Sequence, residues 1–265
     1  MKKNLLNHYV NNQLNSIEQN LNQFNKVKKP ECLHQLRVSI KRIKAIISFA
    51  EDIFKENHSI AELIPLFNKA GKIRELQINI HLLGLFPNPP KKIIKELKKK
   101  EDSLSQQFIK NSSRNIKLID NFHKQSCLPD KLPNQKLIIK YFNVEKKSAT
   151  KKLKVFERDE LHKYRTKIKK LMYVYNFLPK KTQKEIEFNK VKIKRQQEQL
   201  GDWHDNYATI TYLSRIKLPI TSSKHILKLK EKEEKQFNTI STKLIEEQFN
   251  DKHTATNRIK KSLQN

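Results

Sequence analysis

Glycine is almost missing from this sequence, which has three glycines in 265 residues. Loops that cradle nucleotide phosphates need several glycines close together, so we expect no nucleotide site of that kind. Cysteine is also scarce, and Cys32 and Cys127 lack the spacing of a metal or redox motif. We therefore expect two reduced thiols, each buried or half-buried, with no metal site and no cofactor.

Long apolar runs are missing as well, and none approaches the roughly 20 residues that cross a bilayer. The first residues, MKKNLLNHYVNNQLNSIEQN, lack the apolar segment and cleavage site of a secretory signal. These absences favour a cytoplasmic protein with no membrane partner. The motifs H-E-x-x-H and G-x-x-x-x-G-K-[S/T] are also absent, so the sequence favours a binding module over an enzyme.

Acidic residues are in short supply: 27 Asp and Glu stand against 56 Lys and Arg, which gives a formal net charge of +29. A surplus of this size repels itself and is hard to explain as a solubility device. It predicts a polyanionic partner, which by charge alone is a nucleic acid, a phosphate polymer or an acidic membrane.

Apolar residues recur at i, i+3, i+4 and i+7 over long windows, and this period predicts an all-α fold. Prolines stand at most of the breaks between the predicted helices, and Pro65 is expected in the first turns of its helix or at a kink. The predicted helices span residues 3–28, 32–55, 58–86, 90–124, 135–153, 157–178, 182–215 and 222–249. The segment CLPDKLPN marks a linker, so we predict a first four-helix half over 1–127, a linker over 128–134, a second four-helix half over 135–249 and a frayed polar tail over 250–265.

The chain repeats itself across this linker. Four basic positions recur at an offset of 128 residues: His34, Arg37, Lys41 and Arg42 match His162, Arg165, Lys169 and Lys170. Further on, AGKIRE (70–75) matches LGDWHD (200–205) at an offset of 130, which pairs Gly71 with Gly201. Two motifs in the same order favour an internal duplication over a chance match.

The basic positions share one side of their helix. At about 100° per residue, His34, Arg37, Lys41 and Lys44 fall on an arc of roughly 80°, beside the apolar stripe that contains Ile40. Such cations repel one another by about 1 kcal/mol per pair at 4 Å in water, and a bound anion would offset this. A solvated basic face is the alternative for one copy, whereas two copies without interleaved acids favour an anion-binding groove.

The glycine motifs are predicted to face the same groove. Gly71 and Gly201 each cost about 1 kcal/mol relative to Ala inside a helix, so we expect them to allow a close helix approach. Glu75 and Asp205 are predicted to orient a neighbouring Arg or His, with an ordinary ion pair as the alternative. The motifs and the residues before them add further candidate cations: Lys72, Arg74, Lys194, Arg195 and His204.

Two copies of H-x-x-R-x-x-x-[K/R]-[K/R], each followed by a helix with G-x-x-[R/H]-[D/E], resemble the CHAD family, whose name stands for conserved histidine α-helical domain. The strongest matches are LHQLRVSIKRIKAIISFAEDIF (33–54) and LHKYRTKIKKLMYVYNFL (161–178), and the resemblance runs from about His8 to about Phe249. It implies a single CHAD domain made of two pseudo-symmetric four-helix bundles. Between the bundles, a basic cleft or pore would bind long-chain inorganic polyphosphate.

The resemblance implies a stand-alone polyphosphate-binding or targeting protein, associated with polyphosphate granules and with proteins of polyphosphate metabolism. The alternative is a nucleic-acid-binding helical protein that uses the same basic surface, with Trp203, Tyr164, Tyr173 and Tyr175 as stacking surfaces. A scaffold that docks other proteins onto polyphosphate is a third interpretation. The predicted polyphosphate-binding residues are His34, Arg37, Lys41, Arg42, Lys44, Lys72, Arg74, His162, Arg165, Lys169, Lys170, Lys194, Arg195 and His204, supported by Glu75 and Asp205.

Overall fold

The computed structural model describes residues 4–150, 157–215 and 223–262, in which helices joined by short loops are the regular secondary structure and no strand occurs. The elements before the linker are α1 (Leu5–Val27), α2 (Pro30–Phe54), the 3-10 turn η1 (Ala61–Leu63), α3 (Ile64–Gly84), α4 (Lys91–Lys110) and α5 (Ser112–Gln125). Those after it are α6 (Gln135–Thr150), α7 (Arg158–Phe177), α8 (Lys180–Lys184), α9 (Lys190–Ser214) and α10 (Ser223–Ser262).

Helix ends follow the punctuation of the sequence. Pro30 begins α2 and Pro65 lies in the first turn of α3, where the missing N–H costs no hydrogen bond. The side chain of Asn189 accepts a hydrogen bond from the backbone N–H of Lys192 at 2.9 Å and so caps α9. The all-α prediction is confirmed.

Three predicted boundaries were wrong. The helix predicted over 90–124 is divided at Asn111, whose side chain donates to the carbonyl of Gln107 and so satisfies the end of α4. The helix predicted over 182–215 is divided into α8 and α9, so the described residues form ten α-helices, where the sequence predicted eight. The predicted tail is helical, because α10 continues to Ser262.

The linker is fixed to the first helix. The side chain of Asn7 on α1 donates to the carbonyl of Leu128 at 2.8 Å and accepts from its N–H at 3.2 Å. The backbone N–H of Asn4 donates to the carbonyl of Asp130 at 2.7 Å. These bonds hold the connection between α5 and α6 against the first half of the chain.

Apolar side chains make one main core and one smaller cluster. The pairing of α1 with α2 begins the main core, which continues through α6, α7 and α9 to α10. Burial of each large aliphatic side chain contributes about 1.5–3 kcal/mol. The smaller cluster joins α3, α4, α9 and α10 through Leu76, Leu83, Ile93, Leu97, Leu213 and Leu229.

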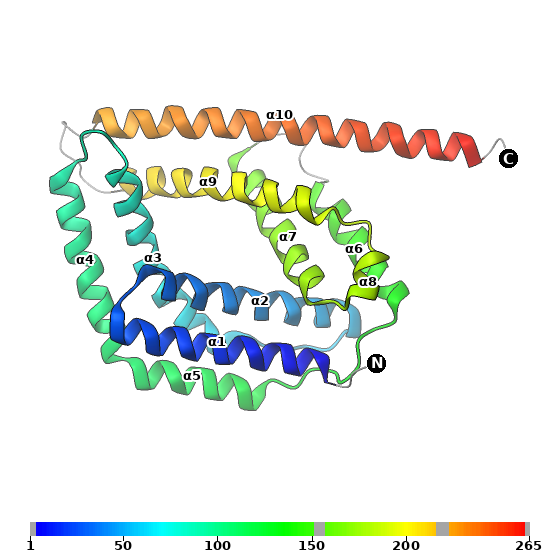
Figure 1. The fold of residues 1–265 in the computed structure, drawn as a ribbon, viewed down its shortest axis with the longest axis horizontal. Helices are drawn as coiled ribbons and strands as arrows, with labels where there is room; N and C mark the ends of the chain where they lie inside the picture. Colours follow the sequence, from blue (N-terminus) through cyan, green and yellow to red (C-terminus); the bar gives the residue numbers. More distant parts are fainter. Residues whose placement is uncertain (1–3, 151–156, 216–222, 263–265) are drawn as a thin grey trace.

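Four helices form a closed circuit at the centre of the molecule. Helix α2 packs against both α3 and α7, and α9 packs against the same two helices from the opposite side (Figure 1). The remaining helices lie outside this circuit, with α1 beside α2, α4 beside α3, α6 beside α7 and α10 along α9. The basic motifs on α2 and α7 and the glycine motifs on α3 and α9 therefore surround one space.

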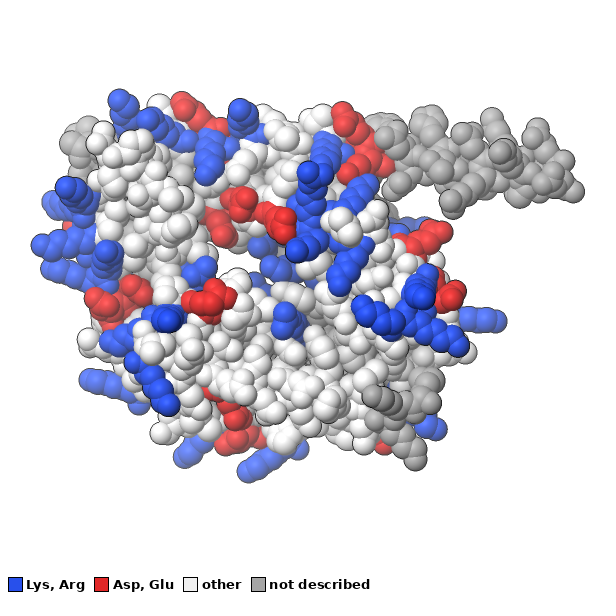
Figure 2. All heavy atoms as spheres, viewed as in Figure 1, with Lys and Arg blue, Asp and Glu red and all other residues white. Residues whose placement is uncertain are grey.

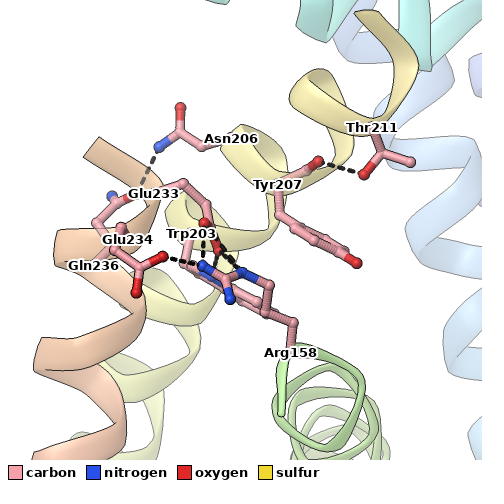
Figure 3. A network of polar contacts seen from close by, with 8 residues as sticks. All are labelled: Arg158, Trp203, Asn206, Tyr207, Thr211, Glu233, Glu234 and Gln236. Carbon is pink, nitrogen blue, oxygen red and sulfur yellow. Dashed lines mark hydrogen bonds and ion pairs between the residues drawn. The ribbon is translucent and has the colours of Figure 1, made fainter. Parts of the chain in front are cut away.

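A polar network fixes α10 to this circuit (Figure 3). Glu233 on α10 is buried, and Arg158 at the start of α7 donates to it through Nε at 3.0 Å and through a second nitrogen at 2.9 Å. The indole Nε1 of Trp203 on α9 donates to the same carboxylate at 2.6 Å. One carboxylate thus joins α7, α9 and α10.

Candidate functional site

Basic side chains from all four central helices converge on one space. The charge of Lys41 on α2 interacts with Lys169 and Arg165 on α7 and with Asp205 on α9. His34 and Arg37 on α2 interact in turn with Arg74 on α3. We call the residues that meet here the central cluster: His34, Arg37, Lys41, Arg74, Glu75, His162, Arg165, Lys169, His204 and Asp205.

The molecule is hollowed where these helices meet. Figure 2 shows a depression at the centre of one face, between α9 and α2, with Lys and Arg atoms within it and Asp and Glu atoms on its rim. On the α7–α9 side, the rings of His162 and His204 stack with their centroids 4.9 Å apart. We refer to this space as the central hollow.

The cluster holds like charges in partly desolvated surroundings. Burial, followed by repulsion from Lys169 and Arg37, lowers the pKa of Lys41 to about 7. Burial and Arg165 lower the pKa of Lys169 to about 8, and burial and Arg74 lower that of Arg37 to about 10. The positive charge is therefore poorly compensated by the protein itself.

The pKa values of the two histidines of the basic motifs, His34 and His162, are lowered as well. Burial and then Arg74 lower the pKa of His34, while burial and then the neighbouring His204 lower the pKa of His162. Both imidazoles are therefore held mostly neutral near pH 7, and each still carries one N–H donor.

Arg37 is held by the backbone and ring of α3. Its Nη1 donates to the carbonyl of Phe67 at 2.5 Å, and its guanidinium carbon lies 3.9 Å from the centroid of the Phe67 ring. Gly71, one turn further on, provides the room, because a Cβ at this position would lie 2.2 Å from Nη1. Sequence reasoning missed Phe67, although its i, i+4 spacing from Gly71 places both on the same side of α3.

The prediction for the two glycines holds in part. Gly71 allows a close approach, but the approaching group is the guanidinium of Arg37 rather than another helix. At Gly201 the prediction was wrong, because a Cβ there would meet no atom within 4 Å. The second half thus has open space at the position where the first half holds an arginine.

Several donors in the cluster have no partner within the described part of the chain. Lys41 and Lys169 form no ion pair with the described carboxylates, whereas Lys170 and Lys192 do. The Nε atoms of Arg74 and Arg165 are buried, and neither has a hydrogen-bond partner there. Buried cationic donors are usually paired, so these two nitrogens leave positive charge that the described part of the protein does not offset.

Arg42 and Lys170 face away from the cluster. Arg42 donates to the side chain of Gln13 on α1 at 3.3 Å, and Lys170 pairs with Asp52 at 3.2 Å and with Glu145 at 3.7 Å. The reason is geometric, because one residue beyond Lys41 or Lys169 is a rotation of about 100° around the helix.

Four other predicted cations are exposed, and no described interaction joins them to the cluster. Lys194 pairs weakly with Glu198 at 3.9 Å on the outer side of α9. The remaining three are Lys44, Lys72 and Arg195. The structure therefore brings together ten of the sixteen predicted site residues, the ten of the central cluster.

The two acids moderate the charge of the cluster. Asp205 raises the pKa of Lys41, Arg165 and Lys169 against the larger lowering by burial, and Glu75 does the same for Arg37. The closest contact of Asp205 with a histidine is 3.5 Å, to Nδ1 of His204, which is long for an orienting hydrogen bond.

Residues at matching positions of the sequence repeat interact at two places. Lys41 interacts with Lys169, its counterpart at the offset of 128 residues. Thr209 on α9 donates to the side chain of Asn79 on α3 at 2.7 Å, and these buried residues differ by the offset of 130 that also separates the two glycines.

The aromatic residues considered as stacking surfaces lie in the core. Trp203, Tyr164 and Tyr173 expose 0%, 6% and 8% of their surface, and Tyr175 stacks on Phe188. Of the two free thiols, Cys32 is buried and Cys127 is exposed, so half-burial was wrong for Cys127.

Within the ranges that the structure describes, no three His, Cys, Asp or Glu side chains gather into a metal site. Nor does any helix there have the length and apolar character needed to cross a membrane.

No protein-family model matches this sequence, and no curated protein does. By structure, the chain is similar to the crystal structure of the CHAD domain from the plant Ricinus communis, with a TM-score of 0.65. The similarity covers 89% of this chain and 88% of that one, at 14% sequence identity. At this identity the likeness concerns the fold.

Proposed function

Because the chain has the fold of a CHAD domain, we propose that it binds inorganic polyphosphate in the central hollow. It acts as a binding module, with no catalytic step. Its location is the cytoplasm, and its partners are polyphosphate and the proteins that make or degrade this polymer. Arg and Lys of the central cluster contact successive phosphates, and the histidines add N–H donors.

The observation that carries this proposal is the set of unpaired cationic donors in the hollow. Lys41 and Lys169 form no ion pair with the described carboxylates, and the Nε atoms of Arg74 and Arg165 are buried without an acceptor. Phosphate oxygens would accept from the two half-buried lysine amines and offset the repulsion between the cations of the cluster. A single carboxylate would satisfy few of these donors, which come from three different helices.

A chain of bare phosphates suits the hollow better than a nucleic acid does. Single-stranded nucleic acids usually stack their bases on exposed aromatic rings, and Trp203, Tyr164 and Tyr173 are buried. Polyphosphate has no bases to accommodate, and every inner unit offers the same charged oxygens.

We further propose that the two halves arose by internal duplication and that the hollow is a cleft around their pseudo-two-fold axis. The meeting of Lys41 with Lys169 and of Asn79 with Thr209 supports this axis. Polyphosphate reads the same from either end, so two equivalent walls can bind it without a preferred direction.

A competition titration near physiological salt tests this function. Labelled long-chain polyphosphate is displaced with unlabelled polyphosphate, short-chain phosphates, single-stranded DNA, RNA and duplex DNA. We expect long polyphosphate to compete best at matched charge. Equal competition by the nucleic acids would contradict the proposal and indicate a general basic surface.

Matched variants locate the site. Lys41→Ala with Lys169→Ala removes two amines from the hollow without leaving an ion-pair partner unpaired among the described residues. Lys98→Ala with Lys99→Ala removes two exposed charges from α4. We expect the first pair to weaken binding at least tenfold more than the second, which corresponds to about 1.4 kcal/mol. Equal losses would mean that the position of the charge is irrelevant.

A further inference from the structure

Lys41 and Lys169 are the two lysines that face each other across the proposed axis. Both are half-buried, and neither has a carboxylate partner among the described residues. Two ammonium groups in this arrangement repel each other, and partial burial makes the repulsion stronger than it would be in water. Loss of a proton from one amine relieves that repulsion at little cost to the fold.

The groups around this pair are mostly cationic on every side. Helix α2 contributes Arg37 and His34, helix α7 contributes Arg165 and His162, and α9 contributes Asp205 as the acid among them. From α3, the ring of Phe67 lies 5.9 Å from Nζ of Lys41, and Arg74 faces Arg37. Two carboxylates, Asp205 beside the lysines and Glu75 beside Arg37, are therefore opposed by several positive charges.

Resting on the proposed function, we propose that polyphosphate binding in the hollow is coupled to proton uptake by Lys41 and Lys169. Each neutral amine takes one proton from solvent and becomes an ammonium ion that pairs with a phosphate oxygen. No covalent bond changes, and the buffer supplies the protons. Affinity for the polymer then depends on pH, and alkaline conditions release it.

The size of the effect follows from linkage. The pKa of Lys41 is about 7 and that of Lys169 is about 8. At about pH 8 the two amines together therefore lack between one and two protons. Phosphate oxygens opposite the amines restore these protons. For each proton taken up, the association constant falls about tenfold per pH unit.

The pH of the measurement distinguishes proton uptake by the lysines from proton uptake by the histidines. The pKa values of His34 and His162 are lowered, so both rings are neutral well below pH 8 and lie far from titration there. Terminal phosphates of the polymer lose protons near neutral pH, and they are few in a long chain. Proton uptake measured with long-chain polyphosphate between about pH 8 and about pH 9 therefore comes mainly from the lysine amines.

Calorimetric titration of the full chain with long-chain polyphosphate tests the coupling. The binding heat is measured at about pH 8 in Tris and in HEPES, whose protonation heats differ, so the difference gives the protons taken up. We expect uptake of about one to two protons. If the polymer binds with the same heat of binding in both buffers, the inference is wrong and the proposed function stands. If no binding occurs in either buffer, the proposed function itself fails.

Variants assign the protons to residues. Arginine stays charged at this pH, so Lys41→Arg with Lys169→Arg should keep the cations and reduce proton uptake at least twofold. It should also flatten the fall in affinity between about pH 8 and about pH 9. Lys98→Arg with Lys99→Arg on α4 is the control and should leave uptake unchanged. Wild-type uptake in the hollow variant would assign the protons elsewhere and overturn the proposal.

Discussion

At the scale of single residues, the two glycines of the repeated glycine motif have different roles. Gly71 makes room for the Arg37 guanidinium, which the carbonyl and ring of Phe67 hold in place. Gly201, its counterpart, borders open space. The same residue type at equivalent positions therefore positions a cation in one half and leaves a gap in the other.

Substitution of each glycine by alanine should separate these roles. Gly201→Ala should stabilise the protein by up to about 1 kcal/mol, because alanine favours the helix and its Cβ meets no atom. Gly71→Ala should lose this gain, because moving Arg37 breaks a hydrogen bond worth about 1–3 kcal/mol. Urea unfolding followed by circular dichroism gives both values. Equal stabilisation in the two variants would contradict the assigned role of Gly71.

The free protein should become more stable as the pH rises from about 7 to about 9. Folding lowers the pKa of Lys41 from 10.5 to about 7 and that of Lys169 from 10.5 to about 8. Between these values the unfolded chain binds protons that the folded chain does not, so the free energy of unfolding increases with pH.

Thermal unfolding at several pH values measures this trend. Lys41→Met with Lys169→Met removes both titrating amines and should flatten the profile relative to wild type. A wild-type profile that falls over this range, or an unchanged slope in the variant, would show that these amines are fully charged in the folded protein.

Residue spacing predicts some of these positions and not others. The spacing of Lys41 and Lys169 at the edge of an apolar stripe places them beside the core, and both lie in the central cluster. The basic residues that directly follow them contact side chains outside the cluster: Arg42 donates to Gln13, and Lys170 pairs with Asp52 and Glu145. Such partners come from distant parts of the chain, so a motif alone does not reveal them.

At the scale of helices, one buried carboxylate joins α10 to both α7 and α9. Glu233 receives hydrogen bonds from Arg158 and Trp203, whereas the adjacent Glu234 pairs with Arg158 at the surface. The side chain of Glu233 is 5% exposed and that of Glu234 is 55% exposed. Buried hydrogen-bonded charges cost more to remove than exposed ones.

Glu233→Gln should therefore destabilise the protein by about 2 kcal/mol, because an amide cannot replace the charged pair with Arg158. Glu234→Gln is the matched control and should cost less than about 0.5 kcal/mol. Chemical unfolding measures both. A loss of the same size in the two variants would mean that burial of Glu233 does not matter.

Helix existence was easier to predict than helix ends. The apolar period fixes α1, α2 and α7 to within a few residues, because each has a long buried stripe. The breaks after α4 and α8 have no proline or glycine to mark them. At Asn111 the chain turns so that α5 can pack against α1, and this tertiary contact is not encoded in local spacing.

At the scale of the whole molecule, the closed circuit of α2, α3, α9 and α7 concentrates like charge at its centre. A bound polyanion should therefore stabilise the folded chain. Long-chain polyphosphate should raise the unfolding temperature, and the rise should shrink steeply with salt because counterions are released on binding. Differential scanning fluorimetry at low and high salt measures this. An increase independent of salt would contradict electrostatic binding.

The single tryptophan of the chain, Trp203, lies between the polar network of α10 and the central cluster. Trp203 donates to Glu233, stacks on Tyr207 with centroids 5.6 Å apart, and precedes His204, whose ring stacks on His162 in the hollow. An indole in these surroundings emits light whose intensity depends on the charge of its neighbours. The protein therefore carries its own optical sensor, one residue away from the site, with no second indole to obscure the signal.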